Sequence, residues 1–150
     1  MDNTKKGQKE QDSKETIYID ANCFIYASLN KDELSKNAME MLEKVRDGFY
    51  EKAYTSTLTI DEFLWRVQKE VGRELASEGA SIFFNLENLE VISIDTQIAL
   101  KALKIYKNEG LDPRDAIHLA AMQSKNVKTL ISSDSDFDGI EGIKRIDFTK

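Results

Sequence analysis

Apolar and polar positions along the chain follow two periods, one typical of strands and one typical of helices. The period of two, with β-branched and aromatic residues, predicts strands over residues 16–20, 53–56, 89–94, 127–133 and 143–146. The helical period predicts helices over residues 22–29, 32–47, 57–88 and 97–108, and from Asp112 onward. Gly72 and Gly79 are expected to break the long third segment into separate helices.

This alternation of strands and helices predicts the α/β class. We expect a three-layer α/β/α sandwich with a mostly parallel central sheet of four to five strands. Residues 1–15 are polar and carry no packing pattern, so they are expected to form a disordered tail before a single domain at 16–150. No apolar run approaches the length that a bilayer-spanning helix needs, and no membrane association is expected.

Composition narrows the class of function without fixing it. The chain is 41% hydrophobic and 32% charged, and Cys23 is its only cysteine, which favours a cytoplasmic globular protein without an intrachain disulfide. The net charge of −6 argues against nucleic-acid binding through a broad basic surface. A nuclease stays possible, because active-site carboxylates contribute to this charge and a bound metal would offset them.

Four acidic stretches lie where predicted strands or helices begin or end. They are Ile19-Asp20-Ala21-Asn22, Ile60-Asp61-Glu62-Phe63, Asp112-Pro113-Arg114-Asp115 and Ser132-Ser133-Asp134-Ser135-Asp136-Phe137. Ligands of open α/β sheets bind beyond the carboxyl ends of the strands, where this topology can bring the acids together. Converging carboxylates repel one another and usually hold a divalent cation. Metal-dependent phosphoryl chemistry is therefore the first hypothesis.

Each acid also has a purely structural interpretation. Asp115 could favour the dipole of its helix, Glu62 could be a surface acid, and Asp134 and Asp136 could serve a turn. Asp20 has the strongest individual case, because an ionised group directly after a hydrophobic strand needs a partner.

Histidine and the aromatic residues are not assigned to the site. His118, the only histidine, is expected to be a hydrogen-bonded structural residue of an alanine-rich helix. Trp65, Phe83 and Phe84 have helical spacings typical of core or dimer contacts rather than of base-stacking platforms.

The same acidic motifs resemble those of PIN-domain proteins, and more narrowly the VapC-type toxin ribonucleases of toxin–antitoxin pairs. The resemblance covers residues 17–148 and rests on the order Asp20-x-Asn22, Ser56 with Glu62, Asp115 before an alanine-rich helix, and Ser-x-Asp134-x-Asp136-Phe. Ser132 stands where Thr is more usual, which keeps the hydroxyl group. The N-terminal tail is a second departure from the family pattern.

The resemblance implies a PIN-like fold and an endoribonuclease that cleaves single-stranded RNA with Mg²⁺ or Mn²⁺. It implies a catalytic set of Asp20, Glu62, Asp115 and Asp134, with Asp136 as a further metal ligand and Asn22, Ser56 and Ser132 as residues that orient the carboxylates. An antitoxin whose C-terminal segment blocks the acidic crevice is implied as a partner. A homodimer is also implied, through the first two helices and residues 63–84.

Two other functions compete with this interpretation. The first is a PIN domain that has lost catalysis and acts only as an interaction module. The second, which fits less well, is a receiver-like signalling domain that binds metal: Asp95 could imitate its phospho-accepting residue, but Ser132-Ser133 does not provide the expected lysine.

Overall fold

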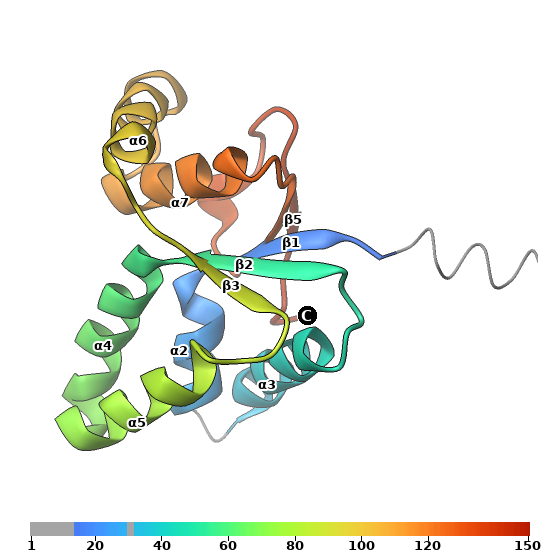
Figure 1. Cartoon of the computed structure of the whole chain (residues 1–150), viewed down its shortest axis with the longest axis vertical. Helices are drawn as coiled ribbons and strands as arrows, with labels where there is room; N and C mark the ends of the chain where they lie inside the picture. Colours follow the sequence, from blue (N-terminus) through green and yellow to red (C-terminus); the bar gives the residue numbers. More distant parts are fainter. Residues whose placement is uncertain (1–13, 30–31) are drawn as a thin grey trace, which may run out of the picture.

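The computed structural model describes residues 14–29 and 32–150, and its centre is a sheet of five strands (Figure 1). The strands are β1 (Thr16–Ile19), β2 (Lys52–Ser56), β3 (Leu89–Ile92), β4 (Thr129–Ile131) and β5 (Lys144–Ile146). Their order in the sheet is β3-β2-β1-β4-β5, and every neighbouring pair is parallel. The prediction of a parallel α/β sheet is confirmed, and β1 lies at its centre.

Helices cover both faces of the sheet, as the three-layer prediction requires (Figure 1). They are α2 (Ala21–Leu29), α3 (Glu33–Arg46), α4 (Thr57–Val71), α5 (Arg73–Phe83), α6 (Thr96–Glu109) and α7 (Pro113–Ser124), with a 3₁₀ turn η1 (Ser135–Phe137) after β4. The first four helices pack on one face, and α6 and α7 pack on the other.

The central strand divides its side chains between two cores. Ile17 and Ile19 belong to the core under α2–α5, whereas Tyr18 belongs to the core under α6 and α7, and all three are fully buried. This follows from the period of two, which turns successive side chains to opposite faces. The only polar group of Tyr18, its hydroxyl, therefore lies inside the protein beneath α7.

Glycines and caps define where several helices end. Gly72 separates α4 from α5 with φ 85° and ψ 170°, as predicted, but Gly79 does not break a helix. Gly79 lies inside α5, where a Cβ atom would be 3.3 Å from Cζ of Phe63, so its small size serves helix packing. The carboxylate of Asp95 accepts a hydrogen bond from the backbone N–H of Ile98 and caps α6. Asp112 stands at the N-cap position of α7, yet its side chain makes no capping hydrogen bond.

The predicted tail lies mostly outside the described residues. Of residues 1–15 the structure describes only the last two, and Glu15 is joined to the sheet: its carboxylate accepts a hydrogen bond of 2.8 Å from Oγ1 of Thr129. Cys23 is fully buried. Within residues 14–29 and 32–150, no helix has both the length and the apolar character required to cross a membrane.

Candidate metal centre

The acidic stretches meet at the carboxyl ends of the two central strands. Asp20 directly follows β1, and Ser132 directly follows β4, which is paired with β1. Glu62 reaches the same region from the second turn of α4, and Asp115 from the first turn of α7.

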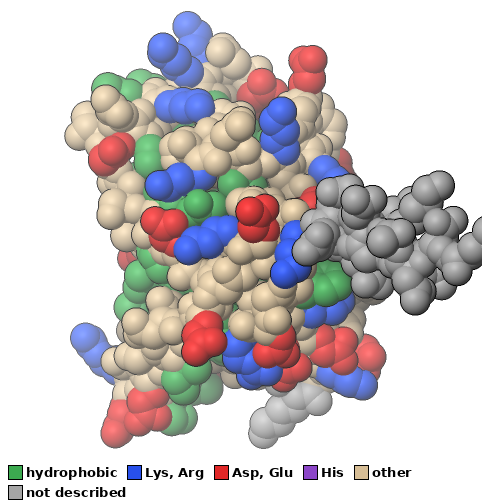
Figure 2. Space-filling view, turned by 45° about the vertical axis from the view of Figure 1, so that its right-hand side comes forward, with side chains coloured by type: hydrophobic (Ala, Val, Ile, Leu, Met, Phe, Trp, Pro, Cys, Tyr) green, Lys and Arg blue, Asp and Glu red, His purple; other side chains and the backbone are tan. Residues whose placement is uncertain are grey.

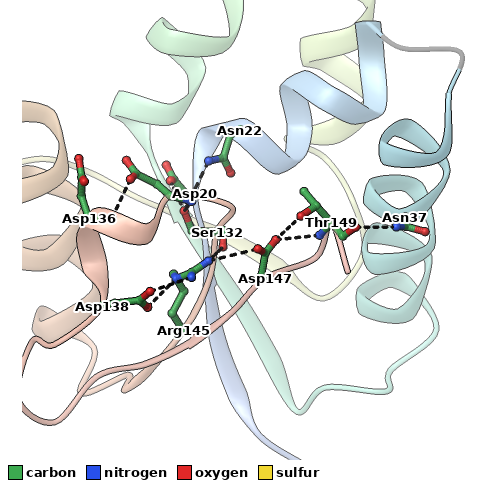
Figure 3. A network of polar contacts seen from close by, with 10 residues as sticks. Asp20, Asn22, Asn37, Ser132, Asp136, Asp138, Arg145, Asp147 and Thr149 are labelled. Carbon is green, nitrogen blue, oxygen red and sulfur yellow. Dashed lines mark hydrogen bonds and ion pairs between the residues drawn. The ribbon is translucent and has the colours of Figure 1, made fainter.

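Asp20 is the buried centre of this region, with 5% of its surface exposed. Its Oδ2 accepts a hydrogen bond of 2.7 Å from Oγ of Ser132, and its Oδ1 accepts one of 2.7 Å from the N–H of Ala21 (Figure 3). Burial raises the pKa of Asp20, and the negative charge of Glu62 adds to this, although His118 and the Ser132 hydrogen bond act in the opposite direction. An ionised Asp20 is therefore costly unless a cation lies beside it.

Ser132 joins two of the acidic stretches through one hydroxyl. Its Oγ donates to Asp20 and accepts from the backbone N–H of Asp134 at 3.0 Å and from Nδ2 of Asn22 at 3.4 Å. The carbonyl oxygen of Ser132 accepts a hydrogen bond of 3.0 Å from Nη1 of Arg145. The Nε and Nη2 atoms of Arg145 donate two further hydrogen bonds to the carboxylate of Asp138 (Figure 3). Strand β5 thus helps to fix the serine that orients Asp20.

Two side chains that the sequence analysis did not assign to the site lie within it. Nε2 of His118 is 2.7 Å from Oε1 of Glu62 and 3.5 Å from Oδ1 of Asp20, and only 1% of the histidine is exposed. Its Nδ1 is 2.7 Å from the hydroxyl of Tyr18, which donates to Oγ of Ser56 at 2.9 Å. His118 is hydrogen-bonded, as predicted, but its partner is one of the predicted catalytic acids. The sequence signal for this placement was the position of His118 three residues after Asp115, which puts both side chains on the same helix face.

The surroundings of His118 favour its charged form. Burial alone would lower the pKa of His118, but the oxygen of Tyr18, the hydrogen bond with Glu62 and the charge of Asp20 outweigh it and raise the pKa well above its ordinary value. A protonated His118 donates a proton to Glu62 from Nε2 and another to Tyr18 from Nδ1. This arrangement satisfies both ring nitrogens inside the protein.

Asp115 belongs to a second, more exposed group of acids. Oxygen atoms of Asp112, Asp115 and Asp136 lie within 4.8 Å of one another. The pKa of Asp115 is raised to about 7 by partial burial, then by the charges of Asp134 and Asp20, while His118 lowers it. These interactions link the two groups of acids electrostatically into one region.

The predicted supporting residues differ in what they contact. Ser132 bonds Asp20 directly, and Asn22 reaches Asp20 through Ser132. Ser56 makes no contact with a carboxylate among the described residues and instead bonds Tyr18. Oδ1 of Asn22 is buried without a hydrogen-bond partner in the described part of the chain, a state that costs about 1–3 kcal/mol.

The donor set suits a hard divalent cation. Carboxylate oxygens of Asp20 and Glu62 lie within 4.8 Å of each other, and the charge of Asp20 acts on Asp115 in the second group. Hard oxygen donors of this kind are the preferred ligands of Mg²⁺ and Mn²⁺. Asp134 and Asp136 add two further carboxylates at the rim, where Oδ1 of Asp134 accepts a hydrogen bond from the N–H of Asp136.

Comparison with known proteins finds a family profile and related sequences. The PIN domain family profile matches residues 17–143. A VapC ribonuclease of Mycobacterium bovis is 28% identical over 132 residues, which are 87% of this chain and 98% of that protein. Ribonuclease VapC13 of Mycobacterium tuberculosis shows the same identity and coverage.

Solved structures share the fold. VapC20 of Mycobacterium tuberculosis, described as a toxin that cleaves the sarcin-ricin loop, superposes with a TM-score of 0.71 at 16% identity, covering 83% of this chain and 95% of that chain. DNA-bound VapBC of Salmonella typhimurium superposes with a TM-score of 0.67 at 20% identity, covering 89% of this chain and 98% of that chain. A toxin–antitoxin complex of Klebsiella pneumoniae gives 0.64 at 22% identity, with coverage of 85% and 95%.

Proposed function

The chain belongs to the PIN-domain family, and from this premise we propose that it is a metal-dependent endoribonuclease acting on single-stranded RNA, the toxin of a toxin–antitoxin pair. The observation that carries the proposal is a buried carboxylate, that of Asp20, which lies within 4.8 Å of ligand atoms of Glu62 and His118. A second group of acids, Asp112, Asp115 and Asp136, adds further carboxylates. A receiver-like domain is a poorer interpretation, because Asp95 caps α6 and is not among these acids.

In this proposal Asp20, Glu62, Asp115 and Asp134 hold Mg²⁺ or Mn²⁺, with Asp136 as a further ligand. Such an ion supplies two things to phosphodiester hydrolysis: it lowers the pKa of a water molecule and neutralises the charge that develops on the phosphate.

The protein contributes the orientation of the carboxylates. Ser132 holds Oδ2 of Asp20, and the N–H of Ala21 holds Oδ1, so this carboxylate cannot rotate freely. His118 holds one oxygen of Glu62 in the same way. Fixed carboxylates of this kind need little rearrangement when a cation and a phosphate arrive.

The charge pattern of the surface is consistent with RNA that contacts the protein mainly near the acidic site. On the face shown in Figure 2, acidic and basic side chains are interspersed, without an extended basic surface. RNA would then be held by a few cations near the acids and by the metal, rather than by a general positive field.

An antitoxin is the proposed protein partner. The solved structures with this fold include a toxin–antitoxin complex of Klebsiella pneumoniae and VapBC of Salmonella typhimurium, which supports a similar pairing here. A segment placing Arg or Lys against the carboxylates would inhibit the site by occupying the position of the cation. Together with the single buried thiol, this setting favours the cytoplasm.

A homodimer is proposed as well, and two apolar surfaces could form it. Val71, Leu75 and Ile82 on α4 and α5 are exposed in the region expected from the family resemblance, and Leu100, Leu103 and Tyr106 form a second exposed row on α6. Light scattering on Leu75→Glu and Leu103→Glu variants would identify the surface, and a strict monomer in the unmodified protein at micromolar concentration would count against a dimer.

The test is cleavage of a labelled single-stranded RNA with Mg²⁺, with Mn²⁺ and with EDTA. Cleavage is expected only with metal, and Asp20→Asn and Glu62→Gln should lower kcat/KM by at least about a hundredfold. Asp61→Asn is the matched control, because Asp61 is the exposed neighbour of Glu62 and should retain full activity. Metal-dependent cleavage that survives both site variants would sink the proposal.

A further inference from the structure

A pocket opens beside the acids and shares one residue with them. It is a cavity of ≈ 370 Å³ between α2, α4 and the start of α7, and its lining includes Asn22, Tyr26, Glu62, Trp65, Arg66 and Arg114. Glu62 belongs both to this lining and to the acidic site, so a ligand in the pocket lies next to the proposed cleavage centre. Mixed apolar and polar walls of this size are typical of small-molecule and nucleotide sites.

We propose that this pocket is a subsite for one nucleobase of the RNA substrate, adjacent to the cleaved phosphodiester. The proposal rests on the ribonuclease function and adds to it a binding site for one base next to the acids.

Trp65 supplies the surface on which the base stacks. Its side chain is 54% exposed, so of the two roles that the sequence pattern indicated, core or dimer contact, the core role is wrong. It stands three residues after Glu62 on α4, which places both side chains on the same helix face. Lys69 lies 4.0 Å from the centre of the indole ring and restrains it. Aromatic side chains beside a catalytic site hold single-stranded RNA by stacking on unpaired bases.

Asn22 lies in the wall of the pocket and carries a side-chain oxygen that is unpaired among the described residues. Its Nδ2 donates to Oγ of Ser132, and this contact fixes the orientation of the amide. Its Oδ1 is the one buried side-chain oxygen or nitrogen without a partner in the described part of the chain. Because this oxygen is closed to solvent, a base edge pairs with it only if the Asn22 side chain turns toward the pocket.

Arg114 supplies a cation for the phosphate that follows the base. Neighbouring Arg66 already forms an ion pair of 2.8 Å with Glu70, whereas Arg114 has no ion pair or hydrogen bond among residues 14–29 and 32–150. Arg114 also directly precedes Asp115, so a phosphate bound there lies next to the acids.

A protein segment is the other occupant that the apolar part of the pocket, formed by Ile25 and Leu29, would accept. Two features fit a nucleotide: its phosphate suits Arg114, which has no ion pair in the described part of the chain, and its position beside Glu62 places it next to the acids. A peptide with its own charged groups would use both features too, so the titration with RNA and with an abasic strand decides between the two occupants.

Trp65 is the only tryptophan of the chain, so tryptophan emission, excited selectively over the five tyrosines, reports on this pocket. The Asp20→Asn variant in Mg²⁺ would be titrated with a six-nucleotide RNA and with an abasic strand of the same length. We expect saturable quenching by the RNA and at least fivefold weaker apparent binding of the abasic strand. Equal responses to the two strands, or none, would overturn the proposal. Emission that changes with a bound antitoxin protein but not with RNA would also overturn it and assign the pocket to a protein segment.

Kinetics of the active enzyme give the second measurement. Trp65→Ala should raise KM about tenfold and change kcat less than twofold, and Trp65→Phe should restore most of the loss. Phe49→Ala is the matched control: Phe49 is 60% exposed and has a lysine, Lys44, 5.4 Å from its ring, but it precedes β2 at the opposite end of the sheet. An unchanged KM in Trp65→Ala with normal cleavage would contradict the base subsite but not the nuclease function. Base-dependent quenching without any cleavage would contradict the nuclease function but not the base subsite.

Discussion

Nε2 of His118 lies 2.7 Å from Oε1 of Glu62, so the only histidine of the chain is bonded to one of the proposed metal ligands. Behind it, the buried hydroxyl of Tyr18 contacts Nδ1 of the same ring. Tyr18 of β1 thereby orients the His118 ring of α7, and His118 orients the Glu62 carboxylate of α4. Three elements are coupled at the site through a single imidazole.

Removing the Tyr18 hydroxyl should weaken both the site and the fold. In Tyr18→Phe, Nδ1 of His118 and Oγ of Ser56 lose a partner in a fully buried place, which should cost about 1–3 kcal/mol of unfolding free energy. Because Glu62 is then oriented less firmly, kcat should fall about tenfold with little change in KM. Urea unfolding and initial cleavage rates measure the two effects.

Tyr50→Phe controls for the loss of a buried phenol. The hydroxyl of Tyr50 lies in the other core, and its contact is a weak one of 3.5 Å with Sδ of Met41. This variant should lose less than about 1 kcal/mol, because sulfur is a weak acceptor, and should keep its kcat. Equal loss of kcat in the two variants would mean that the Tyr18 contact does not orient the site.

Asp115 should make the metal-free protein less stable as the pH rises. Its pKa is about 7 in the folded protein and close to 3.8 when unfolded, so the folded state binds the extra proton between these values. The contribution of Asp115 to the free energy of unfolding therefore falls from about pH 4 to about pH 7 and is constant above that range. Asp115→Asn removes this contribution and should be more stable than the unmodified protein in EDTA at pH 8. The gain should be only on the order of 1 kcal/mol, because the side chain is partly exposed and solvent screens its interactions.

Chemical denaturation in EDTA between pH 4 and pH 8 would measure this difference, with Asp61→Asn as the control for loss of a surface acid. Mg²⁺ at pH 8 should stabilise the unmodified protein more than Asp115→Asn, since the ion requires the ionised carboxylate. A constant difference between the two proteins across the pH range would contradict the raised pKa.

Gly72 and Gly110 should respond differently to the same substitution. Gly72 has φ 85° and ψ 170°, a conformation essentially restricted to glycine, whereas Gly110 has φ 68° and ψ 21°, which asparagine tolerates. Gly72→Asn should cost about 1–3 kcal/mol of unfolding free energy, and Gly110→Asn less than about 1 kcal/mol. Thermal or urea unfolding of the two variants would test this, and similar losses would show that backbone conformation does not limit the joint between α4 and α5.

The features predicted well from the sequence are those that depend on local pattern. The run of β-branched and aromatic residues beginning at Thr16 predicted a strand there, whereas the core that each of Ile17, Tyr18 and Ile19 enters is known only from the fold. The contact between Tyr18 and His118 joins residues 100 positions apart, so no local pattern could indicate it.

Burial of a helical side chain was similarly hard to predict. Trp65 and Phe63 lie two positions apart on α4, yet Phe63 is fully buried and Trp65 is half exposed. The difference depends on where α5 crosses α4, which is a property of the assembled fold. Gly79 was misinterpreted for the same reason, since its role is to let α5 approach Phe63 closely.

Ser132 offers the sharpest test of how Asp20 is held, because a single hydroxyl both donates to the carboxylate and accepts the N–H of Asp134. Ser132→Ala removes both contacts in a fully buried place, so metal affinity should fall about 10–100-fold and kcat/KM with it. Ser132→Thr keeps the hydroxyl and should retain most of the activity if the cavity accepts one methyl group. Mn²⁺ binding followed by electron paramagnetic resonance separates this effect from substrate binding. Loss of cleavage in Ser132→Ala with unchanged Mn²⁺ affinity would show that the hydroxyl acts on the substrate rather than on Asp20.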